Sequence, residues 1–134
     1  MSVPVRECAA MLRGMAPVRV PGRWVFRTVS ADDLPALMDG ARAVFIEAEG
    51  PSVVLPASAG DADVMAQITL QVHSALDGVG LTAAVSDALA RKGIACNVIA
   101  AAHHDHLFVP EARVDEALQI LRALSRTHTT GESE

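Results

Sequence analysis

Aromatic residues are scarce in this sequence, which has one Trp, three Phe and no Tyr among its 134 residues. The core must therefore be aliphatic. A hydrophobic share of 51% against a charged share of 20% argues against general disorder. No apolar run approaches the roughly 18 residues that a membrane-spanning helix needs, so we expect no membrane partner. This length suits one compact domain or two small subdomains that share a core.

Basic residues are also in deficit, because 11 Lys and Arg face 16 Asp and Glu and leave a net charge of −5. A nucleic-acid-binding surface is basic, so we expect no nucleic-acid partner. The two cysteines, Cys8 and Cys96, lie far apart and lack the spacing of a metal or redox motif. The first residues lack the charged-then-apolar pattern of a secretory signal. Together these features predict a cytoplasmic protein with reduced thiols.

The second half of the chain is strongly patterned and predicts the order strand, helix, strand, strand, helix. Residues 65–74 alternate apolar and polar positions, as a half-buried strand does. Residues 81–93 and 114–125 carry apolar residues at helical spacing. The run "IACNVIAA" at 94–101 is almost wholly apolar and predicts a central strand, and residues 106–110 predict the next strand.

The first half repeats this order less clearly. Residues 22–30, 41–50 and 51–57 predict strands, the last two joined as a hairpin at Gly50-Pro51. A brief edge strand is expected at 17–20. Pro35 limits the segment between the first two long strands to about one turn of helix.

A short amphipathic helix is expected at residues 4–15, ahead of these strands. We infer a degenerate internal repeat. The predicted class is α+β, a ferredoxin-like sandwich of two βαββ-type repeats with helices on one face of an antiparallel sheet. The small polar segment "SAGDAD" at 58–63 is the expected linker. The expected boundaries are a degenerate repeat at 1–60, a second domain at 61–126 and a flexible tail at 127–134.

The stretch "ITLQVHSALDGVGLTAAVSDALARKGIACNVIAAAHHDHLFVP" resembles the ACT domains of small-molecule sensors. With "PGRWVF" and "AVFIEAEGPSVVLP" ahead of it, the chain from about Leu12 to Leu124 resembles small bacterial proteins with tandem ACT-like repeats. Related ACT repeats occur in aspartate kinases and in arginine sensors. The resemblance implies βαββαβ modules that bind amino acids at module interfaces. No obvious final strand follows Leu124, so the second module either borrows a strand or stays open.

The segment "DGVGLTA" at 77–83 places two glycines between a strand and a helix start. Unpaired N–H groups and the positive end of the helix dipole make such a start a seat for a carboxylate. From the residues alone, a tight strand-to-helix connection is the favoured alternative. The resemblance implies instead a ligand site beside this loop, with contacts from Ser74, Val79, Gly80, Leu81 and Thr82.

Asn97 interrupts the apolar run at 94–101. A polar side chain in a central strand must be hydrogen-bonded, since leaving it unsatisfied costs roughly 1–3 kcal/mol. A bound amino acid or a neighbouring backbone group would satisfy it equally well. The resemblance implies that this strand forms the other wall of a ligand groove, with contacts from Asn97, Val98 and Ile99.

Three histidines and Asp105 occupy four consecutive positions, 103–106. Successive strand residues point to opposite faces, so the four side chains cannot converge on one metal ion, and two ligands alone do not make a zinc site. Neither a nucleophile nor a substrate pocket is signalled. We therefore expect His103, His104 and Asp105 to turn a hairpin, with no metal and no cofactor. His104 or His106 is expected to face a partner module or the ligand.

The favoured function is that of a regulatory or sensor protein that binds a small molecule, above all an amino acid, and is not an enzyme. The expected partners are the ligand, a second copy of the chain and a separate regulated protein. Two alternatives remain at this point. One is a structural or interaction module with vestigial pockets, and the other is a small metal-dependent enzyme built on "HHDH".

Overall fold

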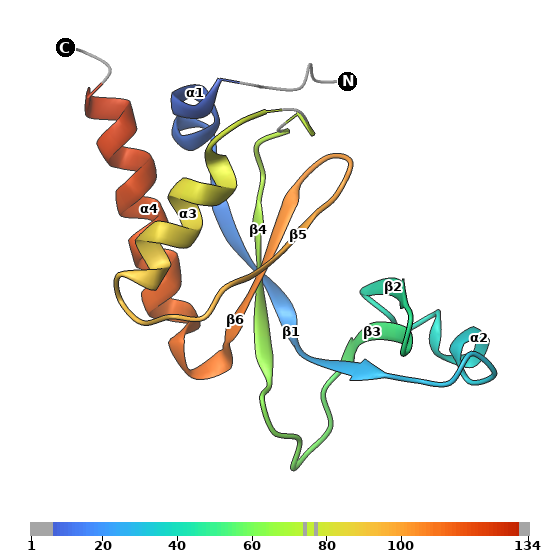
Figure 1. Cartoon of the computed structure of the whole chain (residues 1–134). Coiled ribbons are helices and arrows are strands. Elements are labelled where there is room, and N and C mark those ends of the chain that lie inside the picture. Colours follow the sequence, from blue (N-terminus) through green and yellow to red (C-terminus); the bar gives the residue numbers. More distant parts are fainter. Residues whose placement is uncertain (1–6, 74, 77, 132–134) are drawn as a thin grey trace. The chain divides into compact units, whose positions relative to one another are not determined.

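A computed structural model of the chain describes residues 7–73, 75–76 and 78–131 (Figure 1). The chain forms two compact units. The smaller unit comprises residues 22–65, and the larger one joins the beginning of the chain, up to residue 21, to everything from residue 66 onward.

Among its described residues, the larger unit has three α-helices, which Figure 1 shows on one side of its strands. In chain order its elements are α1 (Cys8–Arg13), the first part of β1 (Pro17–Thr28), β4 (Met65–Leu70), α3 (Leu81–Ala90), β5 (Asn97–Ala100), β6 (Asp105–Pro110), the short 3-10 helix η1 (Glu111–Arg113) and α4 (Val114–Gly131). The predicted order of strand, helix, strand, strand, helix is confirmed. The described helices include none with the length and apolar character that a membrane crossing requires.

An aliphatic core lies between these helices and the sheet. Ile68 and Leu70 alternate along β4, and both are fully buried as the pattern predicts. Val85 and Leu89 meet them from α3. Each such side chain contributes about 1.5–3 kcal/mol on burial. The remaining buried core residues on α1 and α4 include Met11, Leu12, Val114, Ala117, Leu118 and Leu121.

The smaller unit is a three-stranded antiparallel sheet with one turn of helix. It contains the rest of β1, α2 (Leu34–Leu37), β2 (Ala43–Glu47) and β3 (Gly50–Pro56). β3 pairs with β1 on one side and with β2 on the other, so the hairpin predicted at Gly50 is confirmed. The Arg42 guanidinium lies over the Trp24 ring, 4.3 Å from its centroid. Such a cation–π contact holds the residue just before β2 against the buried Trp24 indole.

The strand order accounts for the strand that the second module lacks. Hydrogen bonding orders the strands as β2-β3-β1-β4-β6-β5. β1 thus lies beside β4, where a βαββαβ module places its own last strand. The Gln71 N–H, just after β4, donates to the Met15 carbonyl at 2.8 Å. The module therefore borrows a strand, and the two strands predicted at 17–20 and 22–30 are one continuous element.

β5 lies at the end of this strand order, so the expectation of a central strand at 94–101 was wrong. Only four residues of the apolar run form a strand. Ile94 is buried in the core ahead of β5, and Val98 packs partly against the same core. The run is apolar partly because Ile94 and Cys96, in the loop ahead of the strand, pack on the core together with Val98 from the strand. Local composition does not separate such a loop from a central strand.

Candidate functional site

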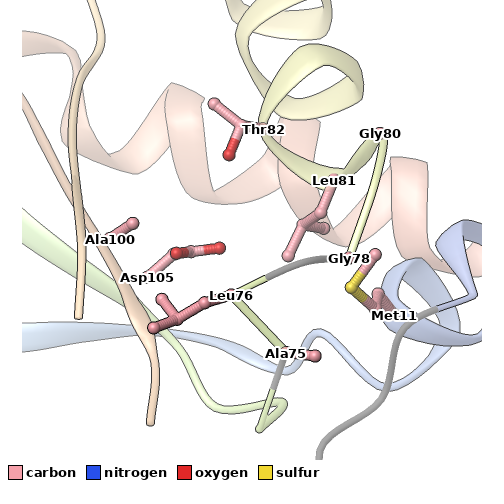
Figure 2. Close-up of a pocket in the computed structure, with 9 residues that line it drawn as sticks. All are labelled: Met11, Ala75, Leu76, Gly78, Gly80, Leu81, Thr82, Ala100 and Asp105. Carbon is pink, nitrogen blue, oxygen red and sulfur yellow. The ribbon is translucent and has the colours of Figure 1, made fainter. Parts of the chain in front are cut away.

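A cavity of about 130 Å³ lies between the start of α3 and the β5–β6 hairpin (Figure 2). Three of its lining residues belong to the predicted ligand set, namely Gly80, Leu81 and Thr82. The other described residues that line it are Met11, Ala75, Leu76, Gly78, Ala100 and Asp105. α1, the segment before α3, the first turn of α3 and the hairpin thus build one small site.

Gly80 shapes the α3 side of the cavity. It is the N-cap residue, and its φ of 106° lies in the left-handed region that favours glycine. Its carbonyl accepts the N–H of Ala84 at 2.9 Å, which is the first bond of the helix. None of the described side chains caps this end of α3. The first-turn N–H groups and the positive end of the helix dipole therefore give this wall a preference for negative charge.

The other predicted ligand residues that the structure describes do not line the cavity. Val79 directly precedes Gly80 but is 79% exposed to solvent. Ser74 falls outside the residues that the structure describes. Asn97, Val98 and Ile99 lie on β5, whose last residue, Ala100, does line the cavity. The structure thus brings together the α3 part of the predicted site and separates the β5 part from it.

The Asn97 amide is satisfied within the sheet. Asn97 is exposed, and its Nδ2 donates to the Phe108 carbonyl on β6 at 3.2 Å. This is the backbone partner that the sequence left open as one alternative. Ile99 pairs with His106 across the same two strands.

Among the lining residues that the sequence analysis did not predict, Asp105 is the charged one. The turn of the hairpin covers residues 101–104, closed by the Ala101 N–H donating to the His104 carbonyl at 3.1 Å. The predicted hairpin is confirmed, but Asp105 is the first residue of β6 and not a turn residue as expected. The signal was alternation, because Asp105 shares a strand face with the core residues Leu107 and Val109.

Four imidazoles gather beside this hairpin. The His73 ring stacks on His103 at 5.1 Å between centroids, and the His104 ring lies 6.2 Å from that of His103. His104 Nδ1 is 3.2 Å from the Val72 carbonyl, and His106 Nδ1 is 2.9 Å from the Thr69 hydroxyl. These contacts tie the hairpin to β4 and the segment just after it. Among the described residues, no group of three or more His, Cys, Asp or Glu side chains is placed to hold a metal ion.

Cys96 lies just before β5, and burial raises the pKa of its thiol to about 11. The thiolate is the reactive form, so this cysteine is a poor nucleophile at neutral pH.

Near the start of the chain, the backbone N–H groups of Ala9 and Ala10 hold the pKa of Glu7 below its usual range. Glu7 caps α1, the helix that contributes Met11 to the cavity.

Two family profiles, both described as ACT domain, match the chain, one over residues 65–123 and the other over residues 4–69. Together they cover both predicted repeats. No curated protein matches the sequence.

Solved structures share the fold. A Vibrio cholerae protein of unknown function is 38% identical, with a TM-score of 0.75, and the match covers 87% of this chain and 94% of that one. An Agrobacterium tumefaciens protein is 22% identical, with a TM-score of 0.64 and coverages of 81% and 87%. An aspartate kinase from Clostridium acetobutylicum is 9% identical, with a TM-score of 0.61 over 83% of this chain and 34% of the enzyme.

Proposed function

The chain belongs to the ACT domain family, and from this premise we propose that it binds a small molecule, above all an amino acid, and acts as a regulatory or sensor protein and not as an enzyme. The observation that carries the proposal is the cavity at the start of α3. Ligand sites are mostly apolar with a few convergent polar groups. The described lining of this cavity matches that description, with the Thr82 hydroxyl and the Asp105 carboxylate among aliphatic and glycine neighbours.

The ligand carboxylate is proposed to sit at the first turn of α3. Helix starts bind anions through their unpaired N–H groups and the dipole. Gly80 lets the backbone approach closely, and the Thr82 hydroxyl adds a hydrogen-bond partner that points into the same space (Figure 2). Leu81, which is buried, supplies apolar contact. Ser74 and Val79 remain proposed contacts from the preceding segment.

The β5 residues Asn97, Val98 and Ile99 are proposed as contacts on a second wall. β5 lies at the end of the strand order, and strand edges are commonly covered by another chain. A homodimer through this edge would give the β5 residues a facing surface. The proposal also includes a separate protein as the regulated partner and a cytoplasmic location.

An interaction module with vestigial pockets is the second candidate, and two observations favour it. The cavity of about 130 Å³ is smaller than the roughly 300 Å³ at which typical ligand pockets begin. In the smaller unit, Phe45 and Ile46 are largely exposed on β2. Neighbouring strand residues point to opposite faces, so these two side chains leave apolar surface on both sides of β2, which a bound protein would cover.

A thermal-shift screen of the full chain against the twenty amino acids separates the two candidates. A ligand at 100 times its Kd stabilises the folded state by about 2.7 kcal/mol, which raises the Tm of a chain of this size by several degrees. We expect at least one amino acid to do so. Thr82→Val should reduce that shift while leaving the ligand-free Tm close to the parent value. A screen in which no amino acid raises the Tm would support the interaction module instead.

A further inference from the structure

One charged side chain lines the cavity. Of its nine described lining residues, Asp105 alone carries a charge, and Thr82 is the other one with a polar side chain. Asp105 is 7% exposed. Figure 2 shows its carboxylate directed into the space below Thr82 and Leu81. A carboxylate at this depth is costly to bury unless it is matched by a cation or by hydrogen-bond donors.

The position of Asp105 follows from strand alternation and not from turn chemistry. It occupies the first place on the face of β6 that continues with Leu107 and Val109, both within the aliphatic core. Leu, Val or Ile would extend that core at lower electrostatic cost. Asp105 takes part in an interaction within the chain. A carboxylate has about four acceptor positions on its two oxygens, so it also accommodates hydrogen bonds from a ligand.

We propose that Asp105 binds the ammonium group of the ligand and so restricts the site to small molecules that carry both a carboxylate and a primary amine. This inference rests on the proposed function, which places the ligand carboxylate at Gly80–Thr82. The two walls then have opposite preferences, since the start of α3 favours negative charge and Asp105 favours positive charge. A hydroxy acid of the same shape offers the Asp105 carboxylate a hydroxyl in place of a charged ammonium group, so it binds with a weaker contact, which is how a polar site rejects a near-isostere.

The size of the cavity further restricts which amino acids we expect it to bind. About 130 Å³ corresponds to the liquid volume of roughly four water molecules. The aliphatic wall of Met11, Leu76 and Leu81 leaves room for a short side chain. Small amino acids are therefore favoured over aromatic ones.

Isothermal titration calorimetry on the full chain tests this with two matched pairs, L-alanine with L-lactate and L-threonine with L-2,3-dihydroxybutyrate. The proteins are the parent, Asp105→Asn and the control Asp115→Asn, which alters an exposed carboxylate in the first turn of α4. A hydrogen-bonded charge pair is worth about 10- to 100-fold in affinity. We expect the parent and Asp115→Asn to prefer the amino acid by that factor. In Asp105→Asn the preference should fall to within about threefold.

The other outcomes contradict either the role of Asp105 or the proposed function. If Asp105→Asn binds the amino acid as tightly as the parent, the role of Asp105 is wrong while the proposed function stands. If the parent binds neither of these amino acids and no other amino acid shifts its Tm, the proposed function itself fails. If Asp105→Asn does not fold, judged by circular dichroism, the parent alone decides the matter. Equal affinity of the parent for the amino and hydroxy acids then overturns the inference.

Discussion

Position 80 combines two constraints that only glycine meets. Its φ of 106° is strained for any side chain, and an added Cβ would lie 2.8 Å from the Cys8 Sγ. Real Cβ atoms do not approach a sulfur so closely, so the Cys8 side chain, α1 or the loop would have to shift. Gly80→Asp, the direct way to place a negative charge at the ligand seat, therefore disturbs folding as well as binding. Thr82 and Asp105 are the better positions for testing the site.

Gly80→Ala should lower the free energy of unfolding by about 1–3 kcal/mol, because it adds both backbone strain and a clash. In a Cys8→Ala background the same change should cost measurably less, since the 2.8 Å contact with the sulfur is gone and only the backbone strain and the 3.3 Å contact with the Cβ of residue 8 remain. Urea unfolding of the four proteins gives the coupling energy directly. If the changes in unfolding free energy of the two substitutions simply add, contact with Cys8 does not contribute to the cost of a side chain at position 80.

Cys96 should be protected from alkylation in the folded chain. With a thiol pKa of about 11, the thiolate fraction at pH 8 is on the order of 100-fold below that of an ordinary cysteine. In a Cys8→Ala variant, which leaves Cys96 as the single thiol, iodoacetamide at pH 8 should react far more slowly with native than with urea-unfolded protein. Similar rates in the two states would contradict the burial of this thiol.

The raised pKa of Cys96 also sets a direction for alkaline stability. The folded state keeps the thiol proton to about pH 11, whereas the unfolded chain loses it near pH 8.5, so the unfolded state binds fewer protons in between. The free energy of unfolding should therefore decline from about pH 8.5 to pH 11. Cys96→Ala should flatten that decline, and an unchanged slope would remove Cys96 as its cause.

Among elements, β5 departs most from its sequence pattern. Its apolar composition predicts a central strand, yet it ends the sheet, and its polar residue serves the sheet and not the cavity. Asn97→Ala should lower the free energy of unfolding by about 0.5–1.5 kcal/mol, the usual contribution of one hydrogen bond. Denaturant unfolding measures this. If the folded Asn97→Ala protein also binds the amino acid more weakly than the parent does, the proposed second ligand wall on β5 is favoured.

The elements that the sequence predicts well are those that bury one face. The alternation of Ile68 and Leu70, and the helical spacing of Val85 and Leu89, are dictated by the core they share. The glycines before α3 predicted its start, but from the residues alone they favoured a tight connection. It was the resemblance to ACT domains that implied a ligand beside Gly80, Leu81 and Thr82, the three predicted residues that line the cavity. Asp105 was missed because its role depends on a helix more than twenty positions earlier in the chain. Alternation along β6 indicates that Asp105 faces inward, but no local pattern near "HHDH" indicates that the start of α3 lines the same cavity.

At the scale of the whole molecule, the repeat was visible in the sequence, but the strand that completes it was not. Which distant strand fills a vacant sheet position depends on long-range pairing, and local patterns do not record it. β1 precedes β4 by more than thirty residues and supplies the edge that the second module needs. The same unit takes Met11, Leu12 and Met15 from the beginning of the chain into its core.

A fragment of residues 61–134 should therefore fail to fold cooperatively, although it contains a whole βαββα pattern. It lacks the neighbouring strand β1 and three fully buried core residues, and each large residue removed from a core costs about 2–5 kcal/mol. Circular dichroism during urea titration, with the full chain as the control, measures this. A sharp transition at the midpoint of the full chain would show that the second repeat is self-sufficient.

The shared strand also constrains how genes of this kind can evolve. β1 begins in one unit and ends in the other, so a recombination breakpoint between the repeats delivers two halves that each lack part of a sheet. Recombination then yields a protein that folds only when the two repeats are transferred together. Substitutions along β1 affect its pairing with two neighbouring strands, β3 and β4. We therefore expect this strand to diverge more slowly between lineages than the exposed hairpin of β2 and β3.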